Sequence, residues 1–509
     1  MVKVTPTGKN LLDMGYSSGK LLGDALRYAQ GRARDGADWA VIQSELEGLF
    51  PKTEGEKIRL RERELEVRVA CRPETDEEYS NLKASLCKIG ELSRVPVVEK
   101  VALMPDNCPA GGEWGSMPVG GGLVTRHHIL PAAHSADINC GMYASFFVPP
   151  SGTIDIGRIL QENCHFGPWS APEQARLDHP VLHEDVWNNP FLSGLEGVAK
   201  DYLGSQGDGN HFTYFGSMVV KRDLIKQLEK HGHADLAASL SGYEQDSLGV
   251  IVSHHGSRQL GAKLYKRGMD HALKETAKIA TGIPKNGSWI DTHTEYGKYY
   301  WEALQYIGRW TEANHQVVHS RILGKIGVQQ IAHVANHHNA IWEHDGLLYH
   351  GKGATPAWND GGVPRLGIIP LNMGRELLIV LGKDNAEFLS FAPHGAGRNK
   401  SRSALKKEFD DPETRQPDQE KIQRELTRLM GSIPVFWASG KADISESPIG
   451  YKPAGKIKKE LAEFGLANLV GEISPKGCIM AGEFPKPNWK GLSRGKGVSP
   501  DRGKFGKNI

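Results

Sequence analysis

The sequence lacks the features that mark a membrane protein or a secreted protein. No apolar run approaches the length of a transmembrane helix, and the opening residues, MVKVTPTGKNLLDMGYSSGK, contain no apolar core of a signal peptide. The six cysteines form no CxxC pair and no disulfide-dense pattern. We therefore expect a soluble protein of a reducing cytoplasm, with no membrane partner.

A strong overall charge is also missing. Lys and Arg number 62 against 60 Asp and Glu, which leaves a net charge of +2 over 509 residues. Such a balance gives no global attraction to nucleic acid, so any RNA binding must come from local patches. We find no internal repeat, and the length allows one large domain or two to three smaller ones.

The texture of the chain changes along its length and predicts an α+β fold. Residues 1–95 are charged and mostly helical in pattern, and residues 96–484 form a central domain rich in Gly and His. Within that domain, short apolar strands such as VALM, YASFFV, LGVIVS and ELLIVLG end in polar clusters, which is how mixed α/β enzymes present a site. Residues 485–509 are basic and rich in Gly and Pro, and we expect a poorly ordered tail.

Several histidines stand in polar clusters that directly follow apolar runs. A single histidine is more often a hydrogen-bonded structural residue, but repeated clusters together with a thiol and a carboxylate favour a divalent ion such as Mn, Zn, Fe or Co. No cluster has HExxH or CxxC spacing, so distant segments would have to assemble the site. The clusters are GDGNHF (His211), VIVSHHGSR (His254, His255), VANHHNA (His337, His338), LLYHGKGAT (His350) and SADINCGM (Asp137, Cys140).

The stretch SFAPHGAGRNKSR places His394 beside a Gly-Ala-Gly turn and a flank of cations. An imidazole can act as a base, a metal ligand or a nucleophile. Glycines permit close approach of the backbone, and cations favour a phosphate. A surface turn with a solvated basic flank is the alternative, and these residues alone leave both readings open.

The order of the motifs DINCGM, GDGNHF, HHGSR, HHNA, GKGATPA, HGAGR and ESPIGYK closely resembles the RtcB family of RNA-splicing ligases over roughly residues 95–455. The segment MPDNCPAGG looks like a degraded form of that family's MPD-x-H-x-G opening, with Cys108 in the place of His. The resemblance implies a mixed α/β fold with the metal and nucleotide site in a central cleft.

The resemblance also implies two Mn ions bridged by Cys140. Asp137 and His211 would complete the ligand set of one ion, and His254 and His338 would hold the other. A bridging thiolate lowers the effective charge of two close cations, and open positions remain for phosphate oxygens.

By the same resemblance, His394 attacks the α-phosphate of GTP and forms a covalent histidine–GMP intermediate. The implied activity joins RNA 3′-phosphate or 2′,3′-cyclic phosphate ends to 5′-hydroxyl ends in tRNA splicing or RNA repair. An archease-like activator is an optional partner. The implied nucleotide-binding residues are Asn210, Tyr214, Asn339, Pro370, Asn372, Met373, Gly395, Ala396, Gly397 and Arg398.

Departures from the family pattern fall on the nucleotide side of the site. Tyr214 stands where the family has a Glu that reads guanine, and residues 370–374 read PLNMG in place of a Gly-Ser loop. We therefore expect weaker base selectivity. Two alternatives stay open, a metal-dependent phosphoesterase that opens cyclic phosphates and a non-catalytic RNA-binding relative. The tail Lys486–Lys507 is expected to add salt-dependent affinity for RNA.

Overall fold

The computed structural model describes residues 5–16, 19–50, 57–109, 117–170, 177–207 and 209–482. Contacts divide the chain into two units, Met1–Ile58 with Ile279–Thr281 and Arg59–Lys278 with Gly282–Ile509. Residues 59–95, grouped by the sequence with the N-terminal extension, make their contacts in the larger unit. The three-part domain division stays a prediction. The basic tail lies outside the described residues.

The smaller unit contains three helices, α1 (Gly8–Asp13), α2 (Lys20–Arg34) and α3 (Trp39–Leu49). Thr7 and Asn10 form a capping box at the start of α1, which satisfies backbone N–H groups that a helix leaves unpaired. Apolar residues at helical spacing meet in one small core, made of Leu11, Tyr16, Ala25, Ala29, Ile42 and Leu46.

The larger unit is built on a sheet in which seven strands follow one another antiparallel, with β18 (Val435–Trp437) pairing parallel to β19 at its side. The apolar runs YASFFV, LGVIVS and ELLIVLG lie in these strands, as predicted. The spatial order is β15 (Leu366–Pro370), β16 (Leu377–Gly382), β19 (Ala467–Gly482), β6 (Gly209–Val219), β7 (Ser247–His255), β5 (Gly141–Phe147) and β9 (Ala332–His337).

This sheet is nearly closed, because its two end strands contact each other. The Asn336 side chain of β9 accepts a hydrogen bond from Ile368 N of β15 at 2.9 Å and donates one to Ile368 O at 3.4 Å. A side-chain amide that pairs with both the N–H and the C=O of one residue takes the place of a backbone hydrogen-bonded pair between strands. The enclosed core includes Met142, Phe146, Tyr214, Val250, Val252, Val334, Ile368 and Ile379.

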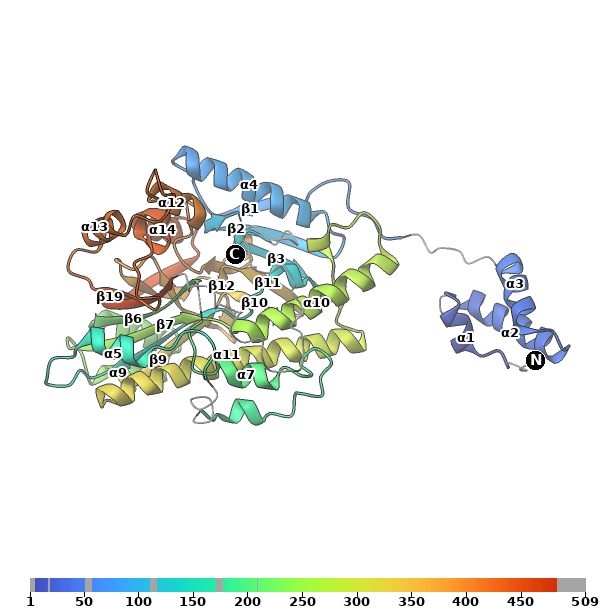
Figure 1. Cartoon of the computed structure of the whole chain (residues 1–509), viewed down its shortest axis with the longest axis horizontal. Helices are drawn as coiled ribbons and strands as arrows, with labels where there is room; N and C mark the ends of the chain where they lie inside the picture. Colours follow the sequence, from blue (N-terminus) through green and yellow to red (C-terminus); the bar gives the residue numbers. More distant parts are fainter. Residues whose placement is uncertain are drawn as a thin grey trace. The chain divides into compact units, whose positions relative to one another are not determined.

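A second sheet carries the predicted strand VALM and lies beneath α4 (Asp76–Ser93), which packs on β2 (Figure 1). Thr75 caps α4 by accepting from Glu78 N, and three acidic residues occupy the first turn, where they complement the helix dipole. The strand order is β1 (Val67–Val69), β2 (Val98–Cys108), β3 (Val119–Thr125), β11 (Leu347–Lys352) and β10 (Asn339–His344). Three short pairs complete the strands, β12 (Ala354–Pro356) with β17 (Phe391–Pro393), β4 (His128–Ile129) with β8 (Ile290–Asp291), and β13 (Asn359–Asp360) with β14 (Val363–Pro364).

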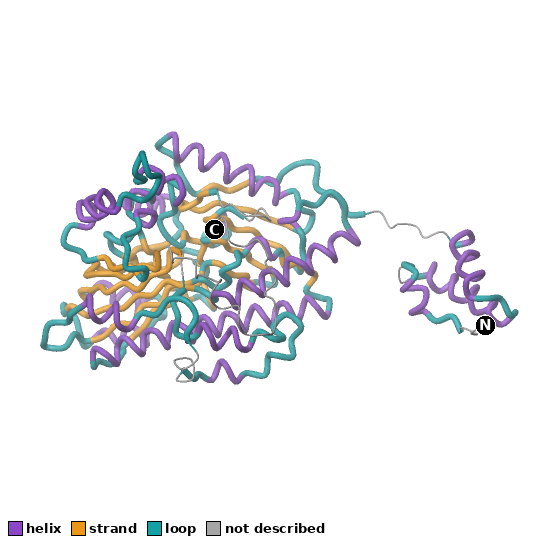
Figure 2. The backbone as a smooth tube through the Cα atoms, viewed as in Figure 1, coloured by secondary structure: helices purple, strands orange, loops and turns teal. Residues whose placement is uncertain are grey.

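Helices cover these sheets, so the described residues combine helix and mostly antiparallel strand, as the predicted α+β class requires (Figure 2). Within the described residues, no helix combines the length and the apolarity needed to cross a bilayer. The central cleft stays a prediction. The helices are α5 (Ile156–Asn163), α7 (Glu196–Tyr202), α8 (Arg222–Lys230), α9 (Ala234–Ser241), α10 (Arg258–Ile279), α11 (Glu295–Ile326), α12 (Arg402–Glu408), α13 (Gln419–Met430) and α14 (Ala454–Glu463).

Candidate metal centre and nucleophile

Three candidate metal ligands continue the inward-facing alternation of neighbouring strands. Every second residue of β5, β7 and β9 faces the enclosed core. When this alternation is continued to the ends of the three strands, the inward-facing positions are Cys140, His254 and His338. The register pairs Met142 with His254 and Gly141 with His337, so these strand ends meet. The core residues that set the alternation are Met142, Ala144 and Phe146 in β5, Leu248, Val250 and Val252 in β7, and Ala332 and Val334 in β9.

Five side chains form two groups of three that share Cys140. In each group, one ligand atom per residue lies within 4.8 Å of the other two, with Asp137 and His211 in one group and His254 and His338 in the other. Cys140 Sγ lies 3.5 Å from His211 Nε2 and 3.3 Å from His254 Nε2. His254 Nε2 lies 3.2 Å from His338 Nε2, and His211 Nε2 lies 2.9 Å from Asp137 Oδ2.

Burial sets the protonation of this cluster. It lowers the pKa of His254 and of His338 well below the usual value, so both imidazoles are neutral and keep a lone pair. Burial and then Asp137 raise the pKa of the Cys140 thiol. Burial alone would raise the pKa of the Asp137 carboxyl, but His211 and Arg258 outweigh it and hold that pKa well below its usual range. The thiol must therefore release a proton when it binds a metal.

The donor set fits two divalent ions. Imidazole nitrogen, thiolate sulfur and carboxylate oxygen together suit Mn, Zn, Fe or Co, and a thiolate shared by both groups can bridge two ions. All of these side chains except Asp137 are buried, which limits competition from water. The structure thus contains a candidate His/Cys metal cluster formed by the residues that the sequence singled out.

A polar layer lies between the outer face of β5 and β7 and the helix α11. Ser253 Oγ lies 2.6 Å from His315 Nδ1 and 2.8 Å from His319 Nε2, and His319 Nδ1 lies 2.8 Å from Ser145 Oγ. The His255 ring stacks on His315 with centroids 3.6 Å apart. We call these five residues the α11 polar layer. They are fully buried, and burial lowers the pKa of His319 to about 3.

The HGAGR histidine follows β17 and is held through one ring nitrogen. His394 Nδ1 lies 2.5 Å from Asp106 Oδ2 and 2.8 Å from Gly353 O. A carboxylate and a carbonyl can only accept, so Nδ1 is the ring nitrogen that donates to both. The His394 ring centroid lies 4.6 Å from that of the candidate ligand His338. The arrangement places the His394 ring beside the candidate metal cluster, and its role as a nucleophile stays a prediction.

The glycine turn after His394 packs against the end of β2. Gly397 has a φ of +70°, and a Cβ there would collide with the Asp106 carbonyl oxygen. Gly395 lies against Pro370, whose oxygen is 3.3 Å from the position that a Cβ would take, and Ala396 is buried in the core. Gly397 therefore lets the backbone approach Asp106. Contact of this turn with a nucleotide stays a prediction.

Arg398 is held by neighbouring protein groups. Its guanidinium donates to Lys400 O at 3.0 Å and to Ser445 O at 2.6 Å, and it lies 3.5 Å from a Glu446 carboxylate oxygen. It also lies over the Tyr451 ring at 4.8 Å. These contacts connect the HGAGR segment to the ESPIGYK segment. The predicted role of Arg398 at a phosphate is untested.

Two predicted nucleotide-binding asparagines lie against the metal ligands. Asn339 donates to Asp137 O at 3.3 Å and accepts from Gly353 N at 2.9 Å, so one amide links the Asp137 loop to the loop that holds His394. Asn210 O lies 3.4 Å from His254 Nδ1 and orients that ring. Both residues therefore have a positioning role in the structure, in addition to the role predicted for them.

Other predicted nucleotide-binding residues lie in the core or in turns. Tyr214 is 2% exposed, and its hydroxyl donates to Ile473 O at 3.1 Å, so its ring offers no exposed face to a base in this arrangement. Met373 is 6% exposed in the same core, and Asn372 closes a turn by accepting from Gly374 N at 3.1 Å. Their contact with a nucleotide remains a prediction.

Two residues that the sequence analysis did not select occupy central positions. Asp106, fully buried, contacts both Nδ1 and the backbone N of His394. Arg258 is 8% exposed, and its guanidinium lies 2.5 Å from His211 Nδ1 and 3.7 Å from Asp137. Both stand inside quoted motifs, MPD and HHGSR, which were the available signals.

Comparison with known proteins finds the same family as the resemblance. The profile of the family described as "tRNA-splicing ligase RtcB" matches residues 189–481. The chain is 28% identical over 314 residues to the tRNA-splicing ligase RtcB of Pyrococcus furiosus, which covers 54% of this chain and 29% of that relative.

Two further relatives show how the coverage varies. The tRNA-splicing ligase RtcB of Thermococcus kodakarensis is 28% identical, with 54% of this chain and 58% of the relative covered. The RNA-splicing ligase RtcB of Escherichia coli K12 is 25% identical, with 62% and 78% covered. The chain thus spans less than two thirds of the length of several of the relatives it matches.

Proposed function

The chain belongs to the RtcB family, and from this membership we propose that it is an RNA ligase that works through a covalent histidine–GMP intermediate on His394. Its substrates would be RNA ends carrying a 3′-phosphate or a 2′,3′-cyclic phosphate and RNA ends carrying a 5′-hydroxyl. Processing of tRNA or repair of broken RNA would supply such ends. An archease-like activator is part of the same proposal.

The observation that carries the proposal is the environment of His394. With its proton held on Nδ1 by Asp106 and Gly353, Nε2 is free to attack. In the proposed step a bond forms between Nε2 and the α-phosphorus of GTP, and the bond from that phosphorus to the bridging oxygen breaks. Pyrophosphate leaves with the electron pair.

The buried carboxylate of Asp106 then has a defined task. Bond formation at Nε2 places positive charge on the imidazole, and the adjacent carboxylate stabilises that charge through the Nδ1 proton. When GMP passes to the RNA 3′-phosphate, the electron pair returns to Nε2. In the last step the 5′-hydroxyl oxygen attacks the activated phosphate, and GMP is released.

The candidate cluster of Asp137, Cys140, His211, His254 and His338 would hold two Mn ions. When bound, such ions would polarise phosphate oxygens and lower the pKa of water for opening of a cyclic phosphate. Asn339 and Asn210 would keep the ligand loops in place.

Covalent labelling tests the proposal. The protein is incubated with Mn and α-labelled GTP, and the label that survives a denaturing gel is measured. We expect labelling of the wild type and of His293→Ala, an exposed histidine, and none of His394→Ala. Labelling of His394→Ala equal to the wild type would disprove His394 as the nucleophile.

A phosphoesterase on the same scaffold is a second candidate. The metal-side residues meet at one point, whereas Tyr214 and Met373 of the base side are buried in the core. An enzyme with metals and no nucleotide site would open 2′,3′-cyclic phosphates without labelling by GTP. Release of 3′-phosphate from a cyclic-phosphate oligonucleotide in the absence of GTP distinguishes this activity.

A further inference from the structure

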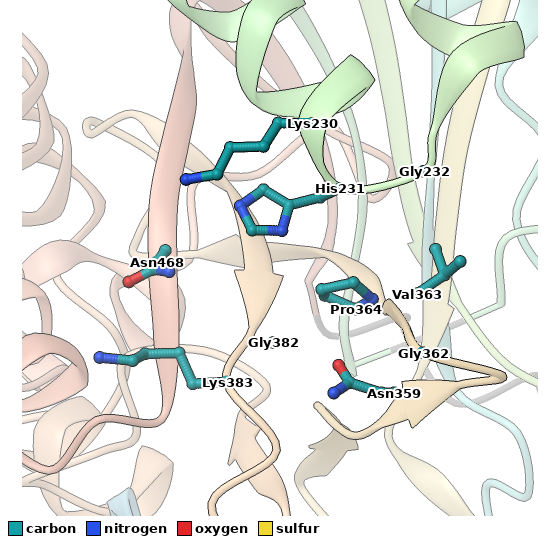
Figure 3. Close-up of a pocket in the computed structure, with 10 residues that line it drawn as sticks. All are labelled: Lys230, His231, Gly232, Asn359, Gly362, Val363, Pro364, Gly382, Lys383 and Asn468. Carbon is teal, nitrogen blue, oxygen red and sulfur yellow. The ribbon is translucent and has the colours of Figure 1, made fainter.

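A pocket of about 540 Å³ opens beside the C-terminal end of α8, bordered by β13, β14, β16 and β19. Figure 3 shows the Lys230 and Lys383 side chains reaching toward the strand that carries Asn468, with His231 between Lys230 and Pro364. We call it the Lys230 pocket. Its lining contains none of the candidate metal ligands and does not contain His394.

The Lys230 pocket is positively charged. Of the described residues that line it, Lys230, Lys383 and His231 are basic and none is acidic. Among the described residues, no ion pair joins Lys230 or Lys383 to a carboxylate, whereas Lys458, in α14, contacts both Glu376 and Glu472. Two lysines without a counter-charge next to the amides of Asn359 and Asn468 suit a phosphate group.

One wall of the pocket is formed where the turn after α8 packs against β14. His233 Nε2 lies 2.7 Å from Pro364 O, which ties the turn after α8 to β14. Gly232 has a φ of +85°, and a Cβ there would lie 2.9 Å from Val363 Cγ2. The close approach of these two segments therefore depends on glycine, and the distance between His231 and Pro364 is set by the fold.

A second pocket, of about 600 Å³, shares Lys383 with the first. We call it the Phe464 pocket. It adds Arg68, Asn385 and the half-buried ring of Phe464. Its two acids are already near cations, since Glu463 lies 2.6 Å from Arg72 and Glu387 lies 3.9 Å from Arg68.

Two adjoining pockets with a shared lysine suit a chain better than a compact ligand. Proteins that hold single strands combine cations along the backbone with aromatic rings on which bases stack. Here the cations come from the Lys230 pocket, and the aromatic ring comes from the Phe464 pocket. Inorganic phosphate or a mononucleotide would fill one pocket and leave the other unused.

We propose that the Lys230 and Phe464 pockets form a track that binds the phosphodiester backbone of single-stranded RNA outside the reaction centre. The proposal rests on the proposed function only in taking RNA as the polyanion. The track would hold a strand through at least two phosphates, one at Lys230 and one at Lys383.

Binding of an unreactive RNA tests the track separately from catalysis. A fluorescent single-stranded oligonucleotide with hydroxyl groups at both ends is titrated with the full chain at several KCl concentrations. For Lys230→Gln/Lys383→Gln, we expect the slope of log affinity against log salt to become shallower by about 1.4, from roughly 0.7 for each of two lost phosphate contacts. Near 0.1 M salt the same loss corresponds to a rise in Kd of roughly twenty- to thirtyfold.

The matched control removes two charges from the same helix region. Lys221→Gln/Lys226→Gln changes two exposed lysines that do not line either pocket, and we expect the wild-type Kd and slope. Equal losses in both double variants, or no loss in Lys230→Gln/Lys383→Gln, would overturn the track. Full displacement of RNA by millimolar GMP would also overturn it, because a compact anion would then suffice.

Labelling with GTP keeps the two proposals distinguishable. We expect Lys230→Gln/Lys383→Gln to form the covalent adduct at the wild-type rate, because neither residue contacts His394 or the candidate ligands. A wild type that binds RNA through the track and forms no adduct would count against the ligase and leave the track in place.

Discussion

The candidate metal ligands and the residues predicted to contact a nucleotide base lie in different surroundings. On the metal side, Cys140, His254 and His338 extend three neighbouring strands and converge to within hydrogen-bonding or ligating distance. On the base side, Tyr214 is 2% exposed and bonded to a backbone carbonyl, and Met373 lies in the core. The same sheet thus positions the candidate metal ligands at its strand ends and buries Tyr214 and Met373 in its core.

The difference separates side chains that are placed to bind an ion from side chains that are placed to fill a core. Metal ligands need an angular arrangement that only a rigid frame provides, and the strand ends supply it. Base recognition needs exposed donors and acceptors, and Tyr214 in the core supplies neither.

Replacing Cys140 with Ala should remove both metal ions, because Cys140 belongs to both groups of ligands. We expect metal content, measured by mass spectrometry after desalting, to fall from two ions per chain to near zero, and GTP labelling to disappear. Cys87→Ala changes an exposed thiol and should keep both ions. Two bound ions in Cys140→Ala would show that the bridge is unnecessary.

Acid should destabilise the fold through its buried histidines. Burial lowers the pKa of His134 to about 4 and the pKa values of His319 and His350 to about 3. Below about pH 6.5 these histidines bind protons in the unfolded chain and stay neutral in the native chain. The free energy of unfolding is therefore highest above that pH and decreases as pH falls toward the native pKa values. Three such residues correspond to roughly 4 kcal/mol per pH unit.

Urea unfolding at pH 7, 6 and 5 in the presence of a chelator measures this loss without interference from metal binding. The exposed His293→Gln variant should follow the wild-type pH dependence. An unfolding free energy that stays constant between pH 7 and pH 5 would contradict neutral buried imidazoles.

Asp106→Asn should slow GTP labelling by about ten- to a hundredfold while metal content stays unchanged, a typical cost for losing a partner that orients a reactive histidine. The amide keeps the shape of the carboxylate and removes its charge beside His394. Initial rates of labelling give the effect, and a thermal unfolding scan checks that the variant is folded. An unchanged rate would assign Asp106 to packing alone.

Tyr214→Phe should have the smallest effect. Loss of the hydroxyl that donates to Ile473 O should lower the free energy of unfolding by about 1 kcal/mol. The ratio of GTP to ATP labelling should stay that of the wild type, because the ring lies in the core. A changed ratio would place Tyr214 at the base and reverse the contrast drawn above.

The candidate metal ligands could be selected from the sequence because their signal is local. His254 and His338 stand at the end of an apolar strand, whereas Cys140 directly precedes β5 and His211 stands near the start of β6. Four of the apolar runs lie in strands of the structure. Strand periodicity could also have separated Tyr214 from His211, since residues three apart lie on opposite faces.

The contacts of His394 could not be predicted in the same way. Asp106 and His394 are 288 positions apart, and they meet because Gly397 allows the two backbones to come into contact. Arg398 donates to Ser445 O and lies near the Glu446 carboxylate, and both of these residues belong to another motif. A sequence pattern states which residue types are present, but pairing between distant motifs depends on how the sheets pack.

The paired histidines have a consequence for how the strands find their register during folding. A slip of β7 by one residue would exchange His254 for His255 and still present an imidazole to the candidate metal cluster, so the candidate ligand itself does not distinguish the two registers. The residues that precede His254 in β7 distinguish the two registers. In the slipped register Ser253 would enter the apolar core in place of Val252 and would lose its partners His315 and His319. The α11 polar layer therefore favours the native register of β7, the strand that carries the candidate ligand His254.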